Sequence, residues 1–210
     1  MWNKPKPDEA LRPAIEALAA LDPDMARAYE ICGLPHVRAH QKGFPGLMRI
    51  VTAQQVSAGA ARAIVARLQE TVAPLEPERF LQIDDDTLRA VGLSRAKIAY
   101  GRALAADLLE GRLDLKKLSR MDDAAAIAHL CQAKGIGRWS AEIYLLFALR
   151  RPDVFPVGDL AIRESMKRLK RLRAHPSEKR AEKIARIWRP HRSAAARMLW
   201  HFYSHAGVPE

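Results

Sequence analysis

The chain has few of the residues that build cross-linked or metal-clustered proteins. Among its 210 residues only Cys32 and Cys131 are cysteines, and they lie far apart without cysteine neighbours. Neither a disulfide framework nor a four-cysteine zinc or iron–sulfur centre can be built from cysteine alone. We therefore expect both thiols to be buried, apolar residues of a protein kept in a reducing compartment.

Long apolar segments are absent as well. A membrane-spanning helix needs a run of about eighteen apolar residues, and no such run occurs. The N-terminal stretch MWNKPKPDEALRP lacks the apolar centre of a signal peptide. We expect an intracellular, cytoplasmic protein without a membrane partner, associated with the nucleoid if it is bacterial.

Acidic residues are outnumbered by basic ones. The chain has 35 Lys and Arg residues against 24 Asp and Glu, which gives a formal net charge of +11. Such an excess favours a polyanionic partner, most often nucleic acid, although a generically basic protein would carry the same charge. The length is typical of a single domain.

Strand-like alternation is missing too, and apolar residues recur instead at helical spacings of three and four. Asp8 and Asp22 are candidate caps of the first two helices, and a loop is expected over residues 33–46. Further helices are expected at about 47–54, 61–72, 77–83, 86–91, 95–110, 122–133, 138–149, 160–171, 177–188 and 191–205. The pattern predicts an all-α fold.

A glycine turn separates two of these expected helices. Gly135 and Gly137 flank Ile136, which can point into the core and join the two helices. A turn that requires positive φ favours glycine. The free N–H groups of the turn and of the helix after it form an anion site that suits a DNA phosphate. From the two glycines alone, an ordinary tight connection between helices is the favoured interpretation.

The surroundings of the turn resemble a known family. The sequence KGIGRW at 134–139, followed by VFPVGD at 154–159, is similar to the helix-hairpin-helix DNA glycosylases, and more narrowly to the 3-methyladenine DNA glycosylases. Three further stretches fit that subfamily: IVTAQQVS at 50–57, VGLSRAK at 91–97 and WRPHRS at 188–193. The resemblance covers about residues 44–203, in order.

The resemblance implies one glycosylase domain over residues 1–210, with two helical lobes flanking a cleft. The first lobe would span about 44–155, and the second about 1–43 plus 156–210, with Asp159 at their junction. The chain has no room for the N-terminal β-rich domain of the longer bacterial enzymes, so none is expected. No cofactor and no catalytic metal are implied, although the hairpin carbonyls of the family sometimes bind a monovalent cation.

The resemblance also assigns roles to single residues. Asp159 matches the essential aspartate, whose charge would stabilise the cationic sugar and orient the attacking water. Its place before a helix also fits a simple N-cap, and Asp153 is the nearest rival carboxylate. Trp139 stands where lyase-type relatives have a Schiff-base lysine, so the enzyme should be monofunctional.

Residues around these two would contact the base and the DNA. The base pocket would be lined by Trp139, Ile143, Leu160 and His191, which is poor in aromatic residues compared with the best-known bacterial relatives. Trp2, Tyr29, Phe44 or Phe155 could supply further aromatic rings. The wedge that fills the gap left by the flipped base would come from Gln54 and Gln55, with Gln55 the better match. A role of these glutamines in bridging helices is the alternative.

Backbone contacts to DNA would come from Lys134, Gly135, Gly137 and Arg138 at the hairpin. Arg95, Lys97, Arg192 and the basic run 167–173 are further candidates, though such runs are usually solvated helix faces. We expect a monomer that excises alkylated purines such as 3-methyladenine and 7-methylguanine from double-stranded DNA. The alternatives are a glycosylase for another lesion and a non-catalytic module that binds damaged DNA.

Overall fold

The computed structural model describes residues 6–38 and 40–205 and is helical, as predicted. No strand occurs in these residues, and the one β-bridge joins Pro7 to His36. The chain divides into two compact units. Unit 2 is the continuous stretch His40–Leu149, and unit 1 combines the described parts of residues 1–39 and 150–210. None of the described helices is long and apolar enough to cross a membrane.

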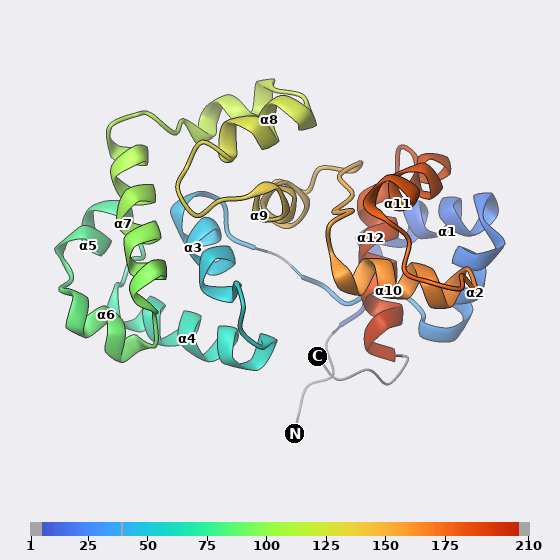
Figure 1. Cartoon of the computed structure of the whole chain (residues 1–210), viewed down its shortest axis with the longest axis horizontal. Coiled ribbons are helices and arrows are strands. Elements are labelled where there is room, and N and C mark those ends of the chain that lie inside the picture. The colour runs from blue at the N-terminus through green and yellow to red at the C-terminus, as the bar shows by residue number, and fades with distance from the viewer. Residues whose placement is uncertain (1–5, 39, 206–210) are drawn as a thin grey trace. The chain divides into compact units, whose positions relative to one another are not determined.

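Unit 2 is organised around its first helix, α3, which lies among the other helices of the unit (Figure 1). Leu47, Met48 and Val51 of α3 are fully buried, and the helix packs against α4, α7, α9 and the segment after α9. The elements of unit 2 are α3 (Gly43–Ala53), α4 (Ala58–Thr71), α5 (Pro77–Gln82), α6 (Asp85–Val91), α7 (Arg95–Leu109), a 3-10 turn (Leu115–Arg120), α8 (Asp123–Leu130), α9 (Arg138–Ile143) and a π-helical segment (Tyr144–Ala148).

Unit 1 is built around its last helix, α12, which packs against α1, α2 and α10. These helices come from both parts of the unit's sequence and lie together (Figure 1). The elements of unit 1 are a 3-10 turn (Glu9–Leu11), α1 (Arg12–Leu21), α2 (Pro23–Cys32), α10 (Leu160–Leu169), α11 (Glu178–Ala185), a second 3-10 turn (Arg186–Trp188) and α12 (Arg192–His205).

A buried carboxylate ties the two parts of unit 1 together. Asp22 caps α2 and accepts hydrogen bonds from Lys170 Nζ and from Trp188 Nε1, both at 2.8 Å. Burial acts to raise the pKa of Asp22, but the hydrogen bonds from Lys170 and Trp188 outweigh it and lower that pKa. Lys170 belongs to the basic run 167–173, so this lysine of the run has a structural role.

Two local expectations are wrong. Helix α3 begins at Gly43, inside the expected loop, because the Gly43 N–H donates to the Tyr144 hydroxyl at 2.8 Å. Gly46 lies so close to the Gln41 backbone that a Cβ atom would come within 1.9 Å of the Gln41 oxygen.

The second wrong expectation is the burial of both thiols. Both are free, but Cys32 is only half-buried and Cys131, at the end of α8, is exposed.

Candidate active site

The hairpin of unit 2 joins α8 to α9, and Gly135 gives it its shape. Gly135 has a φ of +86°, and a Cβ atom there would lie 2.5 Å from Cγ of Tyr100 in α7. Both the backbone angle and the close approach therefore require glycine. Ile136 is 4% exposed, which confirms that it anchors the turn in the core.

Gly137 differs from Gly135 in both respects. It precedes α9 with φ −90° and ψ 176°, an extended backbone that any residue adopts, so the expected positive φ is wrong at this position. A Cβ atom at Gly137 would meet no atom within 4 Å. Packing inside the protein therefore does not explain this glycine, and the backbone here is open to a ligand.

The charged residues of the hairpin face outward. Lys134 is exposed, and Arg138 is 68% exposed while its Nε donates to Oε1 of the buried Glu142 at 2.9 Å. That ion pair holds the guanidinium along the first turn of α9. Trp139 follows with 36% of its surface exposed, whereas Ile143, one turn later, is 5% exposed. Ile143 is therefore mainly a core residue of unit 2.

The turn between α3 and α4 holds the two glutamines. Gln55 is exposed and has a left-handed backbone with φ +56°. Gln54 is half-buried, and its Nε2 donates to Gly135 O at 2.9 Å and to Ser140 Oγ at 3.1 Å. Gln54 thus bridges to the hairpin, and Gln55 is the glutamine that projects from the turn.

Lys97 fixes the same turn from another side. Its Nζ donates to Thr52 O at 2.8 Å, and burial lowers the pKa of this ammonium group. The motif VGLSRAK therefore has a structural explanation: Ser94 caps α7 and Lys97 holds the last turn of α3. Arg95, between them, is exposed.

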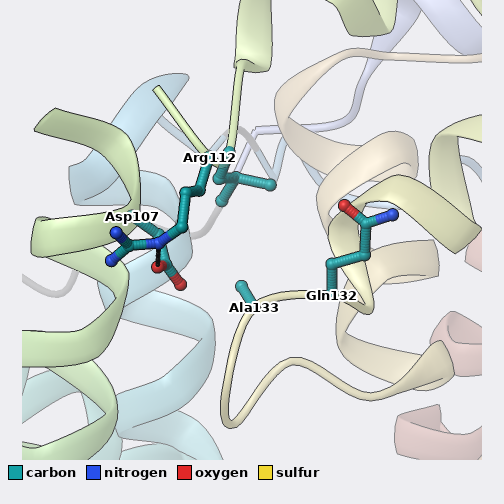
Figure 2. A pocket seen from close by; sticks show the side chains of 5 residues that line it. Asp107, Arg112, Gln132 and Ala133 are labelled. Atoms are coloured by element: carbon teal, nitrogen blue, oxygen red, sulfur yellow. Dashed lines mark hydrogen bonds and ion pairs between the residues drawn. The ribbon is translucent and has the colours of Figure 1, made fainter. Parts of the chain in front are cut away.

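A hollow of about 300 Å³ lies beside the chain entering the hairpin (Figure 2). Arg112 Nε donates to Asp107 Oδ1 at 2.7 Å on one side of it, and Gln132 and Ala133 lie on the other (Figure 2). None of the residues expected to touch the base lines this hollow, so it is not the expected base pocket.

Asp159 of unit 1 stands at the start of α10. Its Oδ1 accepts the Ile162 N–H at 3.0 Å, which makes Asp159 the N-cap of this helix. The same oxygen accepts a hydrogen bond from Trp200 Nε1 in α12 at 3.1 Å. The carboxylate is half-buried and held from two directions. Trp200 was missed by sequence reasoning because no local pattern relates it to a residue 41 positions earlier.

The loop before Asp159 is held by the motif WRPHRS. Arg192 donates from Nε to Asp153 Oδ1 and from Nη2 to Asp153 Oδ2, both at 2.8 Å. The buried Ser193 hydroxyl donates to Arg151 O at 2.6 Å and accepts the Val154 N–H at 2.9 Å. Asp153 therefore serves as a loop anchor, and Arg192 is engaged with it instead of pointing to solvent.

The two remaining expected pocket residues of unit 1 differ in exposure. Leu160, directly after Asp159, is 69% exposed. His191 is half-buried, and its backbone N–H donates to Trp188 O at 2.7 Å.

The other aromatic candidates have partners within their own units. Phe44 packs edge-on against Phe80 and Phe155 against Trp188, and both phenylalanines are buried. Tyr29 accepts a hydrogen bond from Arg12. Trp2 lies outside the described residues. Among the described aromatic candidates, Trp139 is the exposed one.

The chain is similar to known DNA repair proteins. Residues 48–190 match the family model of the HhH-GPD superfamily base excision DNA repair proteins. The DNA-3-methyladenine glycosylase 1 of Schizosaccharomyces pombe is 34% identical over 190 residues, which cover 87% of this chain and 83% of the relative.

Two solved structures are also similar. The Schizosaccharomyces pombe 3-methyladenine DNA glycosylase Mag1, in complex with abasic DNA, has a TM-score of 0.81 and 33% identity and covers 90% of this chain and 95% of its own. The DNA-3-methyladenine glycosidase of Bacillus halodurans has a TM-score of 0.76 and 31% identity and covers 93% of this chain and 90% of its own.

The chain belongs to the HhH-GPD superfamily of base excision DNA repair proteins. Within that superfamily it belongs with the 3-methyladenine DNA glycosylases, hydrolases that act on N-glycosyl bonds.

Proposed function

We propose that this protein releases alkylated purines such as 3-methyladenine and 7-methylguanine from double-stranded DNA and leaves an abasic site, with Asp159 as its catalytic carboxylate. The observation that carries the proposal is the fixed position of Asp159, whose Oδ1 accepts hydrogen bonds from Ile162 N and Trp200 Nε1. It is supported by the similar relatives, which are named for 3-methyladenine and one of which was solved with abasic DNA.

The chemistry explains the need for a held carboxylate. When the N-glycosidic bond breaks, positive charge develops on the sugar, and an anion already in place stabilises that charge without reorganising. Two unit charges 4 Å apart attract by roughly 4 kcal/mol at an effective dielectric constant near 20. Asp159 also orients the water that completes the hydrolysis.

Trp139 supports both the choice of base and the type of reaction. Alkylated purines such as 3-methyladenine are cationic, and an exposed indole attracts a cationic ring by about 0.5–2 kcal/mol. An indole has no amine to form a Schiff base with the sugar, so water is the nucleophile and the strand stays intact. The further residues assigned to the base are Leu160 and His191 of unit 1 and Ile143 of unit 2.

The DNA contacts follow from the exposed parts of unit 2. The backbone at Gly135 and Gly137 holds a phosphate, and Lys134 and Arg138 add positive charge. A monovalent cation would be held by the hairpin carbonyls and would supply further positive charge there. Gln55 enters the stack when the base is flipped out, a step that costs a few kcal/mol. Such an enzyme acts as a monomer inside the cell, where its substrate lies.

The test is base release by the purified wild type and by the Asp159→Asn variant. Asparagine is as good an N-cap as aspartate, so the variant loses the charge but keeps the cap. With methylated duplex DNA and no added lyase, we expect free 3-methyladenine or 7-methylguanine and abasic sites from the wild type, and none from the variant. DNA binding should survive in both proteins.

The matched control is Asp153→Asn, which changes a carboxylate of the same loop that is paired with Arg192. It should retain base release at a temperature where it is folded. Release by Asp159→Asn at the wild-type rate would refute the role of Asp159. Strand breaks produced by the wild type would refute the monofunctional reaction.

A further inference from the structure

The side chain of Gln54 ties the turn that carries Gln55 to the hairpin. Gln54 is the C-cap residue that follows α3, and its Nε2 donates to Gly135 O at 2.9 Å and to Ser140 Oγ at 3.1 Å. The acceptors lie 81 and 86 residues further along the chain, in the hairpin and in the buried face of α9. One amide group therefore joins three separate segments of unit 2.

The neighbouring residues leave the turn little freedom. Lys97 Nζ holds Thr52 O at 2.8 Å on one side of Gln54, and on the other side Ser57 Oγ accepts the Ala60 N–H at 3.2 Å as the cap of α4. Between these fixed points Gln55 has φ +56°, an angle that non-glycine residues adopt only when their surroundings impose it. The exposed side chain of Gln55 is thus aimed by its neighbours.

We propose that Gln54 is a positioning residue that keeps the wedge Gln55 in register with the hairpin. This inference rests on the proposed function, in which the hairpin holds a phosphate and Gln55 fills the gap in the duplex. Successive phosphates of one strand are about 3.4 Å apart along the helix axis. If the Gln55 side chain were displaced by a fraction of that distance relative to the hairpin, it would contact a base pair instead of entering the gap beside the bound phosphate.

The role of Gln54 therefore concerns extrusion of the base and not cleavage of its bond. A base without a pairing partner is easier to flip out than a paired one. Loss of the Gln54 bridge should slow excision of a paired lesion and have little effect on an unpaired one. A residue needed only for folding, or for the chemistry, would change both rates by the same factor.

The experiment compares single-turnover excision of N7-methylguanine from two duplexes, one with cytosine and one with an abasic site opposite the lesion. Gln54→Met retains the length of the side chain and removes the donor. Because two hydrogen bonds are lost, we expect Gln54→Met to excise the lesion about tenfold more slowly from the paired substrate. On the unpaired substrate its excision rate should change by less than about threefold. Ser140→Ala, which removes one acceptor, should give a smaller change in the same direction.

Gln69→Met is the matched control, because Gln69 is an exposed glutamine of α4 in the same unit and should leave both rates unchanged. Equal slowing of Gln54→Met on both substrates, or no slowing on either, would overturn the inference. If Gln54→Met does not fold, the ratio of the excision rates of Ser140→Ala on the paired and unpaired substrates tests the inference instead. A wild type that releases no base would instead refute the proposed function.

Discussion

Trp200 and Asp159 are joined by a hydrogen bond of 3.1 Å between the indole Nε1 and the carboxylate Oδ1. The bond links the middle of α12 to the start of α10, and Ser165 Oγ clamps the same two helices by donating to Leu199 O at 2.8 Å. Because Oδ1 also accepts the Ile162 N–H, the plane of the carboxylate is set by two donors from different helices.

The Trp200→Phe variant should lose most of the excision rate while remaining folded. Phenylalanine retains an aromatic ring in α12 but has no N–H, and a hydrogen bond to a charged group contributes about 1.5–3 kcal/mol. We expect single-turnover base release to fall by roughly tenfold or more, with DNA affinity unchanged. An equal loss of affinity and rate would point to a general disturbance of unit 1.

The two hairpin glycines should respond differently to alanine. Gly135→Ala places a Cβ atom against Tyr100 and forces a side chain into the left-handed region, which alone costs about 1–2 kcal/mol. We expect a clear fall in the melting temperature of this variant.

Gly137→Ala should instead remain stable, within about 1 kcal/mol, because its backbone is extended and the space around it is open. If a phosphate approaches this backbone, the added methyl group should weaken DNA binding severalfold, as fluorescence anisotropy would measure. Unchanged affinity would remove Gly137 from the DNA interface.

Leu160 and Ile143 offer a test of which apolar residue touches the base. Ile143→Ala removes a buried side chain and should destabilise the protein by about 2–5 kcal/mol. Leu160→Ala removes an exposed one and should change stability by no more than about 0.5 kcal/mol. We expect Leu160→Ala to lower base release nonetheless. Full activity of this variant at saturating enzyme would exclude Leu160 from the pocket.

A cluster of three histidines makes stability depend on pH. The His201 ring lies 4.7 Å from that of His36 and 4.5 Å from that of His205, and its Nε2 is 2.9 Å from Cys32 O. Burial, followed by the charges of His205 and Arg38, lowers the pKa of His36. Burial and the same neighbours also lower the pKa of His201, against the opposing effect of the Cys32 carbonyl.

The unfolded chain therefore binds more protons than the folded one once the pH falls below about 6.5, the usual histidine value. The stability from this cluster is complete above that pH and is lost as the pH falls toward the lowered values. We expect the melting temperature to decrease from pH 7.5 to pH 5.5, and His201→Gln to reduce that decrease. A pH dependence identical in the variant would exclude the cluster as its source.

The sequence was informative where structure is decided locally. Asp22 caps α2 as its position predicted, with a side chain that accepts the Asp24 N–H, whereas the side chain of Asp8, the other expected cap, accepts no such bond. Ile136 is buried in the core, as its position between Gly135 and Gly137 predicted. In these cases the neighbours that matter lie within a few residues.

Contacts between distant segments could not be predicted in this way. Nothing near Gln54 in the sequence indicates that its amide is taken by Gly135 O, and nothing near Asp159 points to Trp200. The start of α3 at Gly43 depends on Tyr144, 101 residues away. Resemblance to a family selects Gln54 and Asp159 as candidates, but their hydrogen-bond partners are decided by the folded chain.

The division of the chain has a consequence for synthesis on the ribosome. Unit 2 is one continuous stretch, so its core can form soon after Leu149 leaves the exit tunnel. Helices α1 and α2 are made first, yet α12 and α10, against which α2 packs, come last. The earliest helices can pack on each other, but the faces that meet α10 and α12 stay uncovered while the whole of unit 2 is translated.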